Sequence, residues 1–126
     1  MGRVPHGLPM TGHVIEQVVF DYAVSLADDT GALLRLEQDV EVTTPEGTVT
    51  VDPEHAAAHA PLFVALLHRV VLSAVADEDG TLRVTVGGGP ALVVRPNERY
   101  EAWTFTSHSG RDRVVCLPGG GLATWS

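Results

Sequence analysis

The sequence predicts a mainly-β α+β domain in which one helix joins two similar antiparallel β-meanders, arranged as a sandwich or a partly open barrel. Three observations support this. Short segments in which apolar and polar residues alternate recur along most of the chain. Turn sequences rich in Gly, Pro and Asp separate them. Only residues 52–68 space their apolar side chains as a helix does. The length of 126 residues fits one domain covering 1–126.

The first half predicts a loosely ordered arm and then a β-meander. Residues 1–11 contain Pro5, Gly7 and Pro9, which favour an arm without regular structure. Residues 12–51 form the first meander, beginning with an apolar segment rich in β-branched residues at 14–20. Between residues 34 and 42 the large apolar residues stand at even-numbered positions and charged residues at odd-numbered ones, which indicates one long strand or two short ones.

Residues 52–68 predict the helix. Asp52 is a favourable N-cap, and Pro53 suits the first helical position. Pro61 removes one helical hydrogen bond and crowds the preceding turn, so we expect a kink or two short helices. The apolar stripe expected to pack against the strands consists of Leu62, Phe63, Leu66, Leu67 and Val70.

Residues 69–126 predict a second meander that resembles the first. Residues 14–19 match residues 70–75, and later segments match at an offset of about 56 to 58 residues. Two related halves would pack about a pseudo-two-fold axis, with the helix over one open end or face; the alternative is that two valine-rich meanders align by chance. The residues expected to point inward are Val24, Leu26, Leu34, Leu36, Val84, Val86, Leu92, Val94, Trp103 and Phe105.

Charge narrows the class of partner. Sixteen acidic and eight basic residues give a net charge of −8, and no arginine cluster provides a basic face. Nucleic acid and anionic membranes are therefore not expected partners, whereas a basic protein surface is. The first ten residues lack the apolar stretch of a secretory signal, no apolar segment is long enough to span a membrane, and Cys116 is the only cysteine. A cytoplasmic location is expected.

Several side chains have the chemistry of a metal, nucleophilic or phosphate site. His55 and His59 are spaced i, i+4, as in a helical zinc site, but no further ligands accompany them, so they are weak metal candidates and no cofactor is expected. Cys116 lies in an apolar strand without a neighbouring cation, which favours a structural role. The glycine clusters at 87–89 and 119–121 open strands rather than helices, and therefore predict turns rather than a phosphate site.

Glu101 is the strongest candidate for a ligand-binding residue, together with Tyr100 and Trp103. In an extended strand Glu101 shares a face with Trp103 and Phe105, while Tyr100 takes the other face. A carboxylate beside aromatic rings is either paired with an arginine, such as Arg35, Arg83, Arg95 or Arg99, or binds a ligand over an aromatic floor. The sequence leaves both interpretations open.

The C-terminal motifs carry a resemblance. The sequence Y-E-A-W at 100–103 is followed by V-C-L-P-G-G at 115–120 and L-A-T-W at 122–125, and H-R-V at 68–70 precedes D-G-T-L at 79–82. In this order the motifs resemble an actinobacterial family, domain of unknown function 6188, over nearly the whole chain from about Leu8. The resemblance implies a relative and no activity. Similar short tails occur in some immunity proteins of bacterial toxin systems.

Three functions follow as hypotheses. The first is a non-catalytic binding protein, an immunity-like inhibitor of a basic toxin or a regulatory module, which rests on the acidic composition, the missing catalytic motifs and the open strand edges. The second is a small-ligand site or enzyme between the two halves around Glu101. The third is a structural homo-oligomer.

Overall fold

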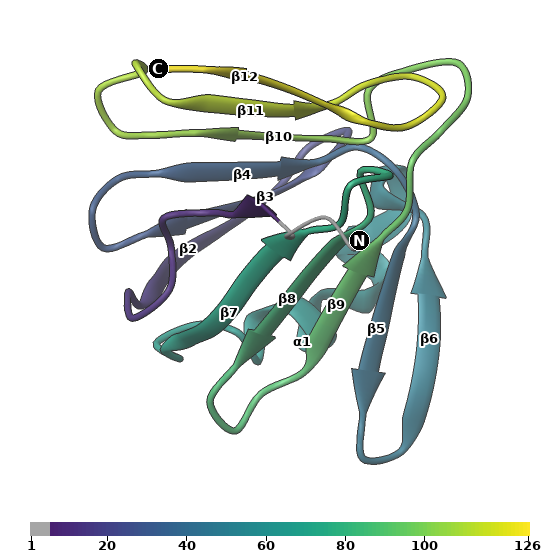
Figure 1. The fold of residues 1–126 in the computed structure, drawn as a ribbon. Helices are drawn as coiled ribbons and strands as arrows, with labels where there is room; N and C mark the ends of the chain where they lie inside the picture. The colour runs from purple at the N-terminus through teal and green to yellow at the C-terminus, as the bar shows by residue number, and fades with distance from the viewer. Residues whose placement is uncertain (1–5) are drawn as a thin grey trace, which may run out of the picture.

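The computed structural model describes residues 6–126 and contains two antiparallel sheets of six strands each, which do not close into a barrel. The strands of one sheet run across those of the other, and the apolar faces enclose the core between them (Figure 1). The predicted mainly-β α+β class is therefore confirmed, as a sandwich. Residues 1–5 of the predicted arm lie outside the described residues.

We name each sheet by one of its strands. The β2 sheet has the order β12 (Leu122–Trp125), β11 (Arg113–Cys116), β10 (Trp103–Thr106), β4 (Leu33–Leu36), β3 (Val24–Asp28) and β2 (Ile15–Phe20). The β7 sheet has the order β1 (His6–Gly7), β7 (Val71–Ala76), β8 (Leu82–Val86), β9 (Ala91–Val94), β5 (Val40–Thr44) and β6 (Gly47–Val51).

Each half of the sequence contributes strands to both sheets. The segment 34–42 forms two short strands, β4 and β5, because the chain leaves the β2 sheet after Leu36 and enters the β7 sheet at Val40. The second half makes the reverse crossing between β9 and β10. The first half thus forms the meander β2–β4 in one sheet and the hairpin β5–β6 in the other, and the second half forms the meander β7–β9 in one sheet and the three strands β10–β12 in the other. Periodicity along one chain does not reveal this division.

The predicted repeat appears in the strand pairing. Leu26 pairs with Leu34 in the first half, and Val84 pairs with Leu92 in the second, each residue 58 positions after its counterpart. The β2–β3 ladder has a bulge between Ile15 and Gln17, and the β7–β8 ladder has one between Val71 and Ser73, 56 positions later. Equal registers and equal bulges support two related halves.

A pseudo-two-fold axis passes between Val14 and Val70, which form an isolated antiparallel bridge with each other. The hydrogen bonds around this bridge come in matched pairs. Ile15 N donates to Arg69 O at 3.1 Å, and Val71 N donates to His13 O at 2.8 Å. The pairing therefore follows the symmetry that the sequence offset of 56 residues implies.

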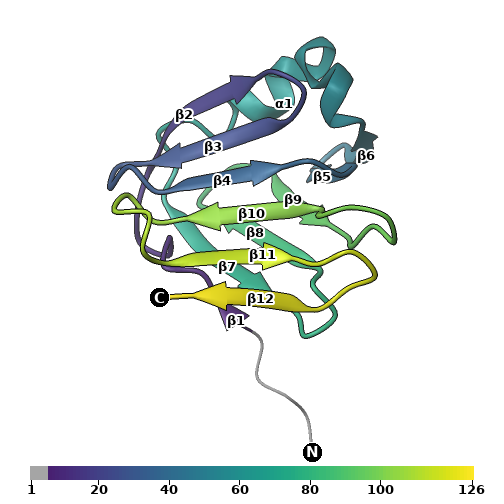
Figure 2. The same ribbon diagram turned by 90° about the horizontal axis from the view of Figure 1, so that it is seen from above.

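The helical passage consists of two short helices, as Pro61 predicts. Residues Pro53–His59 form a 3-10 helix, η1, whose N-cap Asp52 accepts a hydrogen bond from the Glu54 amide, and Ala60–Val64 form α1. The helical range is shorter than the predicted 52–68, because residues 65–68 form turns and His68 has a left-handed φ of 65°. Segment η1 contacts β2 and β6, the edge strands on one side of the sandwich (Figure 2). Within residues 6–126, no helix is long and apolar enough to cross a membrane.

The core confirms every residue expected to point inward, since all ten are buried. It departs from the predicted arm at residues 6–11. Strand β1 pairs with β7, Leu8 N donates to Ala74 O at 2.8 Å, and Leu8 and Met10 are buried in the core. Prolines in this segment suggested loose structure, but burial of two large apolar side chains holds it in place.

Candidate functional site

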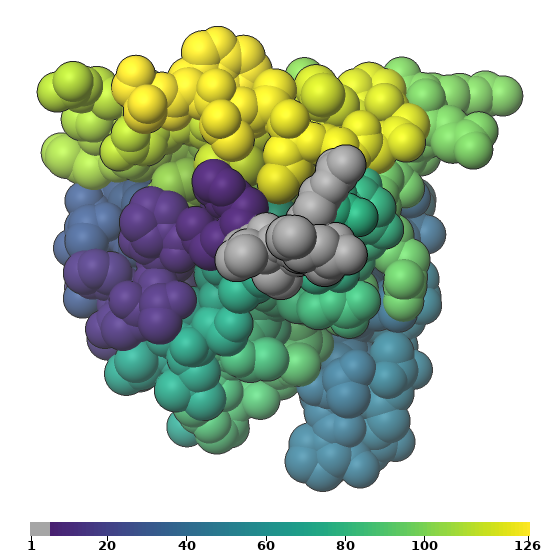
Figure 3. Space-filling view, viewed as in Figure 1, coloured from purple at the N-terminus to yellow at the C-terminus, as the bar shows by residue number. Residues whose placement is uncertain are grey.

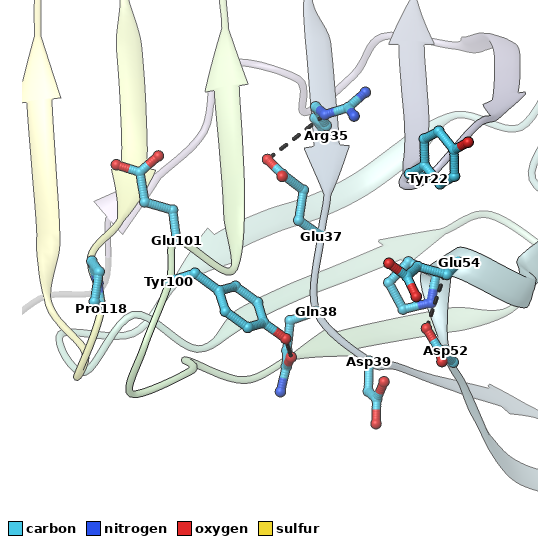
Figure 4. Close-up of a pocket in the computed structure, with 11 residues that line it drawn as sticks. Tyr22, Arg35, Glu37, Gln38, Asp39, Asp52, Glu54, Tyr100, Glu101 and Pro118 are labelled. Carbon is cyan, nitrogen blue, oxygen red and sulfur yellow. Dashed lines mark hydrogen bonds and ion pairs between the residues drawn. The ribbon is translucent and has the colours of Figure 1, made fainter.

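A groove of about 720 Å³ opens where the chain crosses between the two sheets (Figure 4). Five segments of the chain form its wall. They are the β2–β3 turn, the end of β4 with the β4–β5 crossover, the start of η1, the segment before β10, and the β11–β12 turn. The residues that line it are Tyr22, Arg35, Glu37, Gln38, Asp39, Asp52, Pro53, Glu54, Tyr100, Glu101 and Pro118.

The two crossovers are hydrogen-bonded to each other, which fixes the floor of the groove. Glu37 N donates to Ala102 O at 2.8 Å. Gln38 Oε1 accepts from the Tyr100 hydroxyl at 2.9 Å and from Asn97 Nδ2 at 3.3 Å. Gln38 therefore holds Tyr100 beside the β4–β5 crossover, although 62 positions separate the two residues.

The groove is strongly acidic. Among the residues that the structure describes, five carboxylates line it, from Glu37, Asp39, Asp52, Glu54 and Glu101, against the single cation of Arg35. That cation is already paired, because Arg35 Nη1 lies 3.2 Å from Asp21 Oδ2 and Arg35 Nε lies 3.7 Å from Glu37 Oε1. The carboxylates thus leave an excess of negative charge facing solvent.

Local hydrogen bonds favour the ionised form of two acids in this region. A hydrogen bond from the backbone amide of Glu54 is the main cause that lowers the pKa of Asp52 below its usual range, and a hydrogen bond with the His55 side chain adds to it. In the same way, a hydrogen bond from the backbone amide of Ala23 is the main cause that lowers the pKa of Asp21, and a hydrogen bond from the Arg35 side chain adds to it. Both side chains are exposed, so these bonds mainly fix orientation and charge at neutral pH.

Glu101 lies in this groove, but its predicted neighbours were wrong. Strand β10 begins at Trp103, so residues 100–102 do not follow strand alternation and Glu101 does not share a face with Trp103. The Glu101 side chain is exposed, and none of the described residues forms a hydrogen bond or ion pair with it. The expected pairing with Arg35, Arg83, Arg95 or Arg99 is not observed within residues 6–126.

Trp103 and Tyr100 have different roles. Trp103 is fully buried, and its indole nitrogen donates to Gly80 O at 2.8 Å, so it belongs to the core rather than the site. Tyr100 lines the groove and is 46% exposed. Tyr22, a residue that the sequence analysis did not single out, lines it as well and is 82% exposed. The groove thus presents two tyrosine rings rather than the predicted tryptophan floor.

The two candidate metal ligands do not form one site. His55 and His59 lie in a 3-10 helix, where three residues complete a turn, so an i, i+4 pair does not share a face. Both are exposed, and His55 Nδ1 lies 3.2 Å from Asp52 Oδ2. Within the described part of the chain, no group of three or more His, Cys, Asp or Glu side chains could hold a metal ion.

Cys116 and the glycine clusters have structural positions. Cys116 is buried, and this burial raises the pKa of its thiol. Gly120 leaves no room for a side chain, since a Cβ there would lie 2.8 Å from Asp79 O. The cluster at 119–121 is a turn that packs against the turn at 77–80, with Gly121 N donating to Asp79 O at 2.9 Å.

The C-terminal motifs therefore meet in space around Gly80, Trp103, Cys116 and the 119–121 turn. The model of a family described as a family of unknown function (DUF6188) matches residues 6–126. The chain belongs to this family. No curated protein and no solved structure matches the chain. In this DUF6188 member, the motif residues that face the core build the fold, whereas Tyr100 and Glu101 of the Y-E-A-W motif line the groove.

Sequence reasoning missed most of the acidic groove. Glu37 directly follows β4, Asp39 directly precedes β5, Asp52 directly follows β6, and Glu54 lies at the start of η1. Their positions at strand ends were the available signal. Which strand ends meet depends on the crossing between sheets, and alternation within a single strand does not predict it.

Proposed function

We propose that this protein is a non-catalytic binding module whose acidic groove takes a basic segment of a partner protein. The observation that supports the proposal most is the charge of the groove, with five carboxylates around one arginine that is already ion-paired. A concentrated negative surface attracts a basic partner and raises the association rate. An immunity-like inhibitor of a basic toxin and a regulatory module both fit this description.

The two tyrosines add to this proposal. Tyr22 and Tyr100 are exposed rings on the wall of an acidic groove, a setting in which the guanidinium of an arginine gains from both ring faces and carboxylates. Arginine side chains are therefore the preferred groups of the partner. Among residues 6–126, no histidine, serine or cysteine lines the groove, and the proposal requires no reaction there.

The test is the affinity of a fluorescein-labelled octa-arginine peptide, measured by anisotropy at low and high salt. We expect binding that weakens as salt screens the charges. The double variant Asp39→Asn/Glu101→Gln should weaken it at least about fivefold, because two groove charges are removed. The matched control Glu16→Gln/Asp112→Asn removes the same charge outside the groove and should change it little. Equal loss in both variants would show that net charge, not the groove, binds the peptide.

A small organic cation is the second candidate ligand, favoured by the same tyrosines. Spermidine is a suitable probe. If spermidine at micromolar concentration displaces the peptide and binds alone with higher affinity, the groove is a small-molecule site. If displacement needs concentrations at which simple salt acts equally, the peptide remains the better description of the partner.

A further inference from the structure

Strand β6 is the outer strand of the β7 sheet, and no described residue pairs with its outer edge. It belongs to the β5–β6 hairpin, which projects from the body of the molecule (Figures 1 and 3). Four of its five residues, Gly47 to Thr50, are exposed. The edge is therefore accessible along nearly its whole length.

The register of the hairpin identifies the free backbone groups. Thr44 and Gly47 pair across a two-residue turn, which makes them a hydrogen-bonded pair, and Val42 with Val49 is the next such pair. The residues between them, Thr48 and Thr50, consequently direct their N–H and C=O groups away from β5. The hydroxyls of Thr43 and Thr48 lie 2.9 Å apart, as expected for a closely spaced non-hydrogen-bonded pair.

The second half of the chain shows what such an edge accepts. Strand β11 occupies in the β2 sheet the position that β6 occupies in the β7 sheet, because Val42 pairs with Val49 as Phe105 pairs with Val114. Strand β12 lies on the outer edge of β11 and pairs with it antiparallel, so that Cys116 lies opposite Leu122 and Arg113 lies opposite Trp125. After β6 the chain turns into η1 instead, so no strand within residues 6–126 occupies the equivalent place beside β6.

The β6 edge lacks the features that protect edge strands. Residues 47–51 read G-T-V-T-V, without a charge, a proline or a bulge. The β2 edge, by contrast, has a bulge and Glu16. The protection is absent at the edge that leads into the acidic groove, since Asp52, Pro53 and Glu54 follow β6 directly and line the groove.

We propose that an extended basic segment of the partner adds to the β6 edge as an antiparallel strand and places its N-terminal cationic residues in the groove. This inference rests on the proposed function and adds the mode of binding. Main-chain bonds to Thr48 and Thr50 provide part of the affinity, as in other cases of strand addition. An antiparallel strand starts beside Asp52 and ends beside Glu46 in the hairpin turn, so acidic side chains flank both of its ends.

The probe is a labelled peptide with three arginines followed by Val-Thr-Val-Thr-Val. Thr50→Pro removes an outward N–H, a position where an edge strand tolerates proline, and should weaken binding at least about tenfold. The control Thr50→Val keeps the N–H and should bind as the original protein does. Two further peptides test the unmodified protein, each N-methylated at one of the two sets of alternate residues. Only one set directs its N–H groups toward β6, so only one of the two peptides should lose affinity.

The outcomes separate the two proposals. If Thr50→Pro and both methylated peptides bind normally while Asp39→Asn/Glu101→Gln weakens binding, the groove binds the basic segment without strand addition, and this inference is wrong. If neither this peptide nor octa-arginine binds, the proposed function fails. If the free protein sediments as a dimer that Thr50→Pro dissociates, the edge serves a second copy of the chain, and the inference is again overturned.

Discussion

The indole nitrogen of Trp103 donates a 2.8 Å hydrogen bond to the carbonyl oxygen of Gly80, and this bond joins a strand of the β2 sheet to a turn of the β7 sheet. The turn at 77–80 in turn contacts Cys116 and the 119–121 turn. The D-G-T-L, Y-E-A-W and P-G-G motifs of the chain are thus parts of one contact between the two sheets. This contact accounts for the positions of the motif residues that face the core.

Replacing Trp103 by Phe should destabilise the protein by about 1–3 kcal/mol or more, because the substitution leaves the buried Gly80 carbonyl without its donor and reduces the buried volume. The measurement is the free energy of unfolding from urea denaturation. Trp125→Phe is the matched control, since Trp125 is 53% exposed on an edge strand and its loss should change the free energy by less than about 0.5 kcal/mol. Similar effects for the two variants would contradict the assigned role of Trp103.

Gly80→Ala should be strongly destabilising, for two reasons that can be separated. Gly80 has a φ of 95°, and a Cβ there would lie 2.7 Å from Cys116 Sγ. Gly110→Ala tests the first reason alone, because Gly110 has a φ of 78° with no atom within 4 Å of a Cβ. The cost at Gly80 should exceed the cost at Gly110, and Cys116→Ala should make part of the excess disappear. Additive effects of the Gly80 and Cys116 substitutions would show that the contact with the thiol is unimportant.

The pseudo-symmetry predicts a stabilising substitution. His68 has a φ of 65°, and its counterpart 56 positions earlier is Gly12, with a φ of 86°. The two residues also make matched hydrogen bonds, Gly12 N to Val71 O and His68 N to Ile15 O. His68→Gly should raise the free energy of unfolding by up to about 1 kcal/mol, because glycine adopts this conformation without strain. Gly12→Ala should lower it. A loss of stability in His68→Gly would mean that the imidazole makes a contribution larger than the strain.

Acid should destabilise the fold partly through Asp79. The pKa of the Asp79 carboxyl lies below its usual 3.8, mainly because the carboxylate accepts a hydrogen bond from the Thr81 backbone amide. The Thr81 hydroxyl donates a second hydrogen bond that also lowers the pKa. A carboxyl group whose pKa is lower in the folded state stabilises the fold above its unfolded pKa, and this stabilisation is lost as pH falls toward the folded value. The free energy of unfolding is measured between about pH 6 and pH 2, where carboxylates titrate. It should fall less steeply with decreasing pH in Asp79→Asn than in the original protein. Identical slopes would exclude a contribution from this residue.

The predictable and unpredictable parts of this structure differ by the range of the interactions that produce them. Alternation along single strands placed Leu34, Phe105 and the other inward residues in the core, because strand parity is a local property. It failed at Glu101, because the strand begins at Trp103, three residues later than alternation implied. It also failed to place Tyr22 or Asp52 in the same groove as Tyr100, because that arrangement depends on two crossovers between sheets and on hydrogen bonds such as the one from Tyr100 to Gln38.

Binding of a basic segment in the acidic groove can be followed by the backbone amide chemical shifts of the ¹⁵N-labelled protein during titration with octa-arginine. We predict saturable shifts that concentrate at Tyr22, Glu37, Asp39, Asp52 and Glu101. In Asp39→Asn/Glu101→Gln the same shifts should require a higher peptide concentration. A second groove of about 390 Å³ between β1 and β12, lined by Phe105, Val114 and Trp125 among others, provides the internal comparison and should show no shifts. Shifts confined to that second groove, or spread evenly over all acidic residues, would contradict the account.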